Sequence, residues 1–243
     1  MTPRYLILLI LVALSLLLPG ATAAAERGPN VVQLRQAVSQ NPEDPEANYK
    51  LGMKYLEMGR PQLAAKYLKE AVRLKPDYPE ALEGLARLNR EQGNYGGSAQ
   101  DLGKLMQLQP KNKELPERVS NAYNKQGLAL LEGGNAKEAE AAFKEAAKAD
   151  PKAIGPLSNL GVAYFRAGRP AEAAAAFREA AKRDPNNAEA RFNLGLTFVA
   201  SGNMVAAYAL SRDLWRLNPE LAGQLNALSR PPRTPYPYAP PAK

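Results

Sequence analysis

Apolar residues recur at intervals of three and four along most of the chain, and the pattern is clearest over residues 153–184. In the first half of this stretch, the residues that share one face of a 3.6-residue helix are Leu157, Leu160, Gly161 and Tyr164. The second half gives Ala173, Phe177 and Ala180 at the same spacings, and Pro185 ends the pattern. The stretch is therefore predicted to form two amphipathic helices that meet at a turn around residues 168–170.

The same residue types return at intervals of 34 residues on both sides of this stretch. The copy nearest the N-terminus is complete, with Leu51, Gly52, Tyr55, Ala64, Leu68, Ala71 and Pro76. The copy that follows it is looser, because Ala86 stands at the glycine position and Ser98 at the first alanine position. The predicted helix pairs occupy residues 45–78, 79–112, 120–153, 154–187 and 188–221.

The order of Leu-Gly, an aromatic residue three positions later, Ala-x3-Phe and then Pro resembles the tetratricopeptide repeat. This resemblance covers five repeats and implies an all-α fold, a right-handed α-solenoid in which stacked helix pairs bury the apolar faces that one pair cannot bury alone. It also implies a binding module, in which the first helices of successive pairs line a concave wall that commonly holds an extended peptide or a partner helix.

Three further segments flank or interrupt the repeats. Residues 29–44 have helical period and are predicted to cap the N-terminal repeat. Residues 220–230 are predicted to form a C-terminal capping helix, with Trp215 as its main contact. The seven residues 113–119 are close to two helical turns and contain no Gly or Ser, so they favour a longer first helix in the third repeat. A flexible linker between two sub-modules is the alternative.

The amino-acid composition excludes most classes of catalytic site. The chain has no Cys and no His, which excludes disulfides, thiol nucleophiles, imidazole bases and Cys/His metal sites. No glycine-rich turn precedes a Lys-Ser/Thr pair, so we expect no phosphate loop, catalytic residue, cofactor or metal. The net charge of +8 could favour an anionic partner or simply mark a solvated face. Nucleic acid is not an expected partner, because strand-borne aromatics for base stacking are missing.

The two ends of the chain differ from the repeats. Residues 5–18 form an apolar run behind Arg4, and residues 21–25 offer small-x-small cleavage positions. Residues 1–25 are thus predicted to be a secretory signal peptide that exports the protein to a periplasm or beyond. An uncleaved membrane anchor over residues 5–18 is the alternative. The proline-rich residues 231–243 favour a disordered or polyproline II tail, and their PxxP spacings would also suit an aromatic-lined partner groove.

The resemblance places the residues around each Leu-Gly pair on the concave wall. Asn159 and Asn193 directly precede such pairs, and their side-chain amides could bond to the backbone of a bound segment. The other predicted partner-binding residues are Arg87, Arg90, Asn124, Leu128, Val162, Phe165, Arg166, Phe192 and Leu196. The alternative for the apolar members of this set is packing on the following helix. The family's clamp for an acidic C-terminal carboxylate is not indicated, because Tyr49 and Met53 stand where its first polar groups are needed.

Two functions follow from this pattern. The first is a non-catalytic adaptor of the cell envelope that binds a peptide or a segment of another protein through repeats three to five. The second is a membrane-anchored structural scaffold for a secretion, pilus or cell-wall assembly. Cleavage of the apolar N-terminal run would favour the adaptor, and retention of this run would favour the membrane-anchored scaffold.

Overall fold

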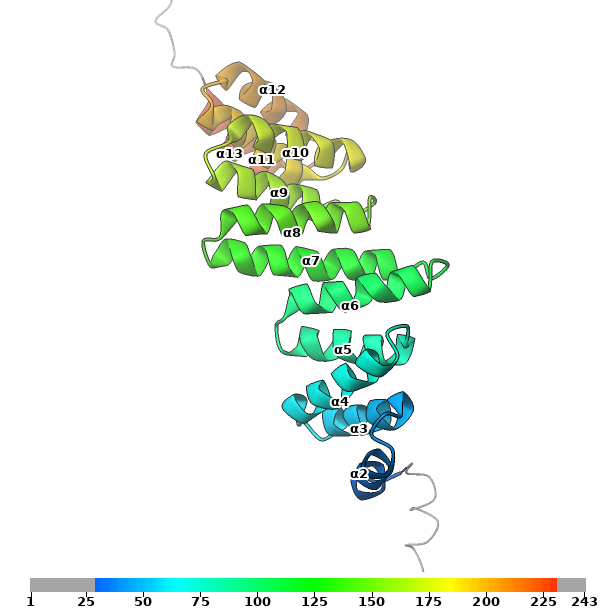
Figure 1. Cartoon of the computed structure of the whole chain (residues 1–243). Coiled ribbons are helices and arrows are strands. Elements are labelled where there is room, and N and C mark those ends of the chain that lie inside the picture. The colour runs from blue at the N-terminus through cyan, green and yellow to red at the C-terminus, as the bar shows by residue number, and fades with distance from the viewer. Residues whose placement is uncertain (1–28, 231–243) are drawn as a thin grey trace, which may run out of the picture. The chain divides into compact units, whose positions relative to one another are not determined.

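The computed structural model describes residues 29–230, and every element in that range is an α-helix (Figure 1). The all-α class predicted from the sequence is confirmed. The predicted signal peptide over residues 1–25 and the proline-rich tail over residues 231–243 lie outside the described residues. The chain divides into two compact units, residues 1–81 and residues 82–243.

The first unit contains α2 (Val31–Gln40), α3 (Pro45–Glu57) and α4 (Pro61–Leu74). Asn30 starts α2 with a capping box. Its side-chain oxygen accepts hydrogen bonds of 3.0 Å from the amides of Val32 and Gln33, and the Gln33 side chain accepts one of 2.9 Å from the Asn30 amide. The pair α3 and α4 buries Leu51 and Leu68 completely between the two helices.

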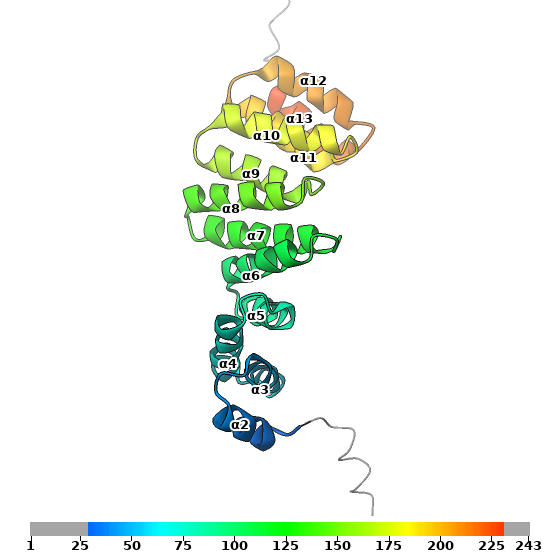
Figure 2. The same cartoon turned by 45° about the vertical axis from the view of Figure 1, so that its right-hand side comes forward.

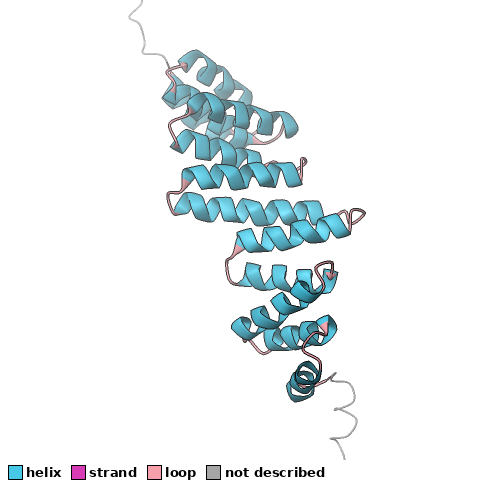
Figure 3. Cartoon of the chain, viewed as in Figure 1, coloured by secondary structure: helices cyan, strands magenta, loops and turns pink. Residues whose placement is uncertain are grey.

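The second unit begins inside α5 (Pro79–Glu91) and continues as a run of antiparallel helices. These are α6 (Tyr95–Leu108), α7 (Leu115–Glu132), α8 (Ala136–Ala149), α9 (Gly155–Arg166), α10 (Pro170–Arg183), α11 (Ala188–Ala200), α12 (Met204–Leu214) and α13 (Pro219–Ser229). Figures 1 and 2 show α7 to α10 stacked side by side in chain order, and Figure 3 shows the short loops between them. Helix α7 also contacts α9, the first helix of the next pair, and α11 contacts the C-terminal helix α13.

Each helix pair turns at a glycine with φ between +64° and +80°, a region that side chains other than glycine rarely adopt. These are Gly59, Gly93, Gly134, Gly168 and Gly202. Three of the four intervals between these glycines equal the repeat length, and the interval from Gly93 to Gly134 is longer by the seven-residue insertion. The turns therefore follow the repeat found in the sequence.

A second glycine of the repeat, in the middle of the first helix, sets how closely the two helices approach. A Cβ atom added to Gly161 of α9 would lie 2.7 Å from Cε1 of Phe177 in α10. The equivalent contact joins Gly127 of α7 to Phe143 of α8, where the added Cβ would lie 2.5 Å from Cε1. The rings of Phe143 and Phe177 are almost completely buried, so the first helix has no room for a side chain at this point.

The insertion is helical from residue 115 onward, after a turn at residues 113–114. Helix α7 spans 18 residues and begins at Leu115, so residues 115–119 of the insertion extend it at its N-terminal end. Leu115 and Val119 are buried together with Leu102 and Leu105 of α6. The added helical residues therefore bury apolar area on the same face as the rest of α7.

The expected contact of Trp215 with the C-terminal capping helix is wrong. Trp215 is 49% exposed, whereas Leu214 is fully buried with Ala222 and Leu225 of α13. The inward face of α12 runs through Ala207 and Leu214, and one further residue turns the next side chain by about 100°. Trp215 therefore points away from the core.

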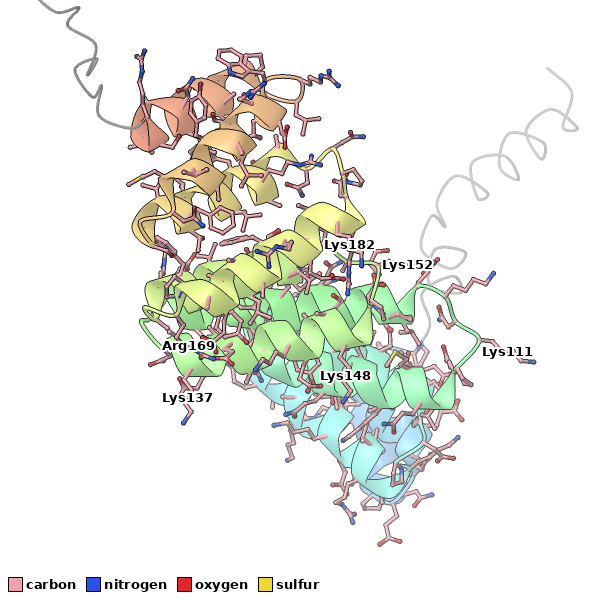
Figure 4. All side chains as sticks on the ribbon, turned by 90° about the horizontal axis from the view of Figure 1, so that it is seen from above. Lys111, Lys137, Lys148, Lys152, Arg169 and Lys182 are labelled. Atoms are coloured by element: carbon pink, nitrogen blue, oxygen red, sulfur yellow. The ribbon has the colours of Figure 1, made fainter. Side chains whose placement is uncertain are left out.

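Adjacent pairs are also joined by an ion-pair network around Arg169, which is labelled near Lys137 in Figure 4. Arg169 donates from Nη1 to Oε2 of Glu140 at 2.6 Å, and it also pairs with Glu172. Lys144 donates from Nζ to Oε1 of Glu140 at 2.7 Å. Glu140 is only 17% exposed, and the hydrogen bond from Lys144, followed by that from Arg169, holds the pKa of its carboxyl below 4.5.

We expect Gly161→Ala to lower the free energy of unfolding by about 1–3 kcal/mol, because the new methyl group meets the Phe177 ring. The matched control is Gly103→Ala in α6, where an added Cβ would meet nothing within 4 Å. That change should raise stability by about 0.5–1 kcal/mol, since alanine favours helix over glycine. Urea unfolding of both variants measures the difference. Stabilisation of similar size at both positions would contradict the close contact.

We expect Glu140→Gln to destabilise the protein by about 0.5–1 kcal/mol near neutral pH, through loss of the ion pairs to Lys144 and Arg169. Because the folded state depresses the pKa of Glu140, this stability is present above the pKa of the unfolded state and is lost as the pH falls through the folded value. The gap between wild type and variant should therefore close as the pH falls through the depressed pKa of folded Glu140. Thermal unfolding against pH tests this, with Glu138→Gln on the same helix as the control. A gap that does not change with pH would contradict it.

Candidate functional site

The predicted binding residues lie on what we call the first-helix face of the second unit. This face consists of the half-buried and exposed side chains of residues 82–91 of α5 and of α7, α9 and α11. Arg87 and Arg90 lie on α5, Asn124 and Leu128 on α7, Asn159, Val162, Phe165 and Arg166 on α9, and Phe192, Asn193 and Leu196 on α11. All of them are half-buried or exposed, whereas the opposite faces of the same helices fill the core.

The structure brings two of the predicted asparagines together. Asn159 of α9 donates from Nδ2 to Oδ1 of Asn124 of α7 at 2.8 Å. The Nδ2 group of Asn124 and the Oδ1 atom of Asn159 have no hydrogen-bond partner among residues 29–230. The pair therefore offers one donor and one acceptor to a bound backbone. Leu128, 37% exposed, and Phe165, 41% exposed, provide apolar surface on the same two helices.

The predicted binding residues on α11 are less accessible to a partner than those on α7 and α9. Phe192 and Leu196 are half-buried against the cluster formed by Ala207 and Leu214 of α12 and by Ala222 and Leu225 of α13. For these two residues the structure shows the packing alternative. The exposed apolar surface beside the asparagines is therefore concentrated on α7 and α9 rather than on α11.

A pocket of about 460 Å³ opens on the same face between α5, α6 and α7. We call it the basic pocket. Its lining residues are Glu83, Ala86, Arg87, Arg90, Tyr95, Ser98, Leu102, Arg118, Asn121, Ala122 and Lys125. Four of these residues are cations and one is a carboxylate. The lining lies wholly within the second unit.

The charges of the basic pocket are only partly neutralised by the protein. Arg118 Nη2 lies 2.5 Å from Oε1 of Glu83, which joins α7 to α5. Arg87 Nε is fully buried and has no hydrogen-bond acceptor among the described residues, since the nearest carboxylate oxygen, of Glu91, is 3.7 Å away. The Nζ atom of Lys125 lies 5.7 Å from the centre of the Tyr95 ring. Positive charge and one unsatisfied donor are therefore left for a ligand.

Sequence reasoning found two of the four cations. Arg87 and Arg90 were predicted from the repeat register, whereas Arg118 and Lys125 were missed. The available signal was their spacing, because residues at i and i+7 on α7 lie on one helix face together with Asn121. Arg118 belongs to the insertion, where the repeat offers no register from which to assign a face.

Residues 29–230 contain neither a candidate metal site nor a candidate membrane span. No three acidic side chains there gather closely enough to hold a metal ion. None of the helices in this range combines the length and the apolar character that crossing a bilayer requires.

The comparisons with known proteins fit the helix pairs. The tetratricopeptide repeat family matches residues 49–113, 114–154 and 158–219, and the chain belongs to this family. Proteins of this family are generally adaptors that bind other proteins or peptides without catalysing a reaction. No curated protein matches the chain.

Several solved structures are similar to the chain. YrrB, a tetratricopeptide protein with an unusual peptide-binding site, is 17% identical, with 82% of this chain and 100% of YrrB covered and a TM-score of 0.51. TTC0263 from Thermus thermophilus is 20% identical, with 76% and 98% covered and a TM-score of 0.39. MamA from Desulfovibrio magneticus RS-1 is 21% identical, with 72% and 96% covered and a TM-score of 0.44. The likeness to YrrB, at 17% identity, shows the fold alone.

A double-mutant cycle on Asn124 and Asn159 should give a coupling energy of about 0.5–1.5 kcal/mol in urea unfolding, the usual net value of one hydrogen bond. Asn193 serves as the control, because it makes no bond with Asn124. The cycle of Asn124→Ala with Asn193→Ala should be additive within about 0.5 kcal/mol. Equal coupling in both cycles would contradict a specific contact between α7 and α9.

Proposed function

We propose that the protein is a non-catalytic adaptor, exported to the cell envelope, which holds an extended segment of another protein on the first-helix face of its second unit. The observation that carries this proposal is the asparagine pair of α7 and α9, whose free donor and acceptor lie on the same helices as exposed Leu128 and Phe165. The fold supports it, because this family generally serves in protein binding.

The chemistry of this face suits an extended chain. A peptide in extended conformation leaves its amide and carbonyl groups unpaired, and an asparagine side chain can satisfy one of each. Alternate side chains of such a segment point to opposite sides and can pack on separate apolar residues. Leu128 and Phe165 supply two such residues on neighbouring helices. YrrB, which has the same fold, is described as carrying a peptide-binding site.

A non-catalytic role is supported by the composition. With no Cys and no His, the chain has no thiol or imidazole to act as nucleophile or base. The hydrogen bonds from Lys144 and Arg169 lower the pKa of the Glu140 carboxyl, and the hydrogen bond from Arg169 lowers that of Glu172. Such a carboxylate stabilises the fold and is a poor general base near neutral pH.

Export rests on the apolar run of residues 5–18 and the small residues that follow it. The intact mass of the protein isolated from envelope tests it. A mass that corresponds to cleavage near Ala23 or Ala25 supports release of the adaptor. A mass that retains the apolar run favours the membrane-anchored scaffold instead.

Affinity capture from envelope extract tests the binding face. We expect the double variant Leu128→Ser/Phe165→Ser to capture its main partner at least about tenfold more weakly than wild type, because two apolar anchors are lost. The control variant Met204→Ser/Val205→Ser removes two exposed apolar side chains from α12 and should capture the same partner as wild type. Circular dichroism confirms that each variant is folded. Equal capture by all three proteins would contradict binding at the first-helix face.

A further inference from the structure

We infer that the basic pocket between α5, α6 and α7 binds side-chain carboxylates, so that the partner segment carries a cluster of Asp or Glu residues. This inference rests on the proposed function and specifies the chemistry of the partner. It concerns a different part of the first-helix face from the asparagine pair, and the two parts meet on α7, where Asn121 and Lys125 line the pocket and Asn124 bonds to Asn159.

The charge balance of the pocket is the first reason. Arg90 takes part in no ion pair with any residue in the range 29–230, and neither does Lys125, whose ammonium group lies over the Tyr95 ring. Arg87 has one carboxylate neighbour, Glu91, at a distance too long for a hydrogen bond. Of the four cations, only Arg118 is matched by a close carboxylate of the protein. An acidic ligand would complete the pairing.

The buried donor of Arg87 is the second reason. Its Nε atom has lost contact with solvent without gaining an acceptor among the described residues. Buried polar groups in folded proteins are normally satisfied, so the protein leaves the Arg87 guanidinium, whose side chain is 40% exposed at the pocket wall, short of acceptors. A guanidinium presents donors in a planar fork that fits the two oxygens of a carboxylate.

The third reason is that the pocket is held open before any ligand arrives. The ion pair between Arg118 and Glu83 joins its two walls, while Leu115 and Val119 anchor the extended start of α7 in the core below. On the floor, the hydroxyl group of Ser98 is already satisfied, because it donates to the carbonyl oxygen of Ala86 at 2.8 Å. The hydrogen-bond donors of the pocket that still lack an acceptor are therefore the cationic groups on its walls. Anchored cations bind a carboxylate with less loss of side-chain freedom.

The test is fluorescence anisotropy of the purified full chain with a short labelled peptide that contains a run of glutamates. Both ends of the peptide are blocked, so only side-chain carboxylates are offered. We expect saturable binding that weakens as sodium chloride is added, because the contacts are ionic. The same peptide with glutamines in place of the glutamates should not bind. Equal binding of both peptides, or no saturable binding of either, would overturn the inference.

Two double variants separate the pocket from the overall charge. Arg87→Gln/Arg90→Gln removes two cations from the pocket and should weaken binding on the order of tenfold or more. Arg178→Gln/Lys182→Gln makes the same charge change at two exposed residues of α10 and should bind as wild type does. Equal weakening in both variants would assign the affinity to net charge and overturn the pocket. Stronger displacement of the peptide by inorganic phosphate than by chloride at equal ionic strength would overturn the choice of carboxylate.

Failure of this inference and failure of the proposed function give different results. Partner capture that depends on Leu128 and Phe165, without binding of the glutamate peptide, overturns only the acidic partner. If binding of the glutamate peptide depends on Arg87 and Arg90 but partner capture is the same for all variants, the basic pocket is supported. The proposed binding face of α7 and α9 is then overturned.

Discussion

The close approach between the two helices of each pair depends on a glycine in the first helix and a large apolar side chain in the second. Gly127 meets Phe143, Gly161 meets Phe177, and in the first unit Gly52 meets Leu68 in the same way. Because the glycine has no side chain, the ring or leucine lies directly on the backbone of the first helix. This contact leaves the other side of the first helix free of packing within its own pair, and that side carries the residues proposed to bind.

Two helix pairs of the second unit lack this contact between a glycine and a large side chain of the same pair. At the second pair Ala86 replaces the glycine, and the partner helix presents Ser98, whose hydroxyl group bonds to the Ala86 carbonyl. At the last pair the added Cβ of Gly195 would meet the Leu225 side chain of α13, so the capping helix takes the place of the missing ring. The first exception lies on the floor of the basic pocket. Departures from a repeat pattern are expected where a site has been built into it.

Most of the fold could be predicted from the sequence, because the 34-residue period fixes which residues face inward and where the chain turns. The seven-residue insertion was assigned to a longer helix from its phase and its lack of Gly and Ser, and α7 is that helix. Trp215 was misplaced because size and apolarity suggested burial, whereas the helical phase of α12 directs Leu214 inward instead.

The site was less predictable than the fold. The register identified Arg87, Arg90, Asn124 and Asn159 as members of one face, but it could not show which of them touch. The bond between Asn124 and Asn159 and the ion pair between Glu83 and Arg118 join residues 35 positions apart. Their formation depends on side-chain rotamers and on the spacing of neighbouring helices. A pattern of residue types contains neither, so these contacts required the structure.

Site-specific photo-crosslinking in the native cell tests the central claim most directly. A photoreactive phenylalanine analogue replaces Phe165 on the first-helix face or Tyr208 on α12, both of which are about 40% exposed. The account predicts a crosslinked partner protein at residue 165 and none of the same mass at residue 208. The same partner at both positions, or a partner at residue 208 alone, would contradict binding on the first-helix face.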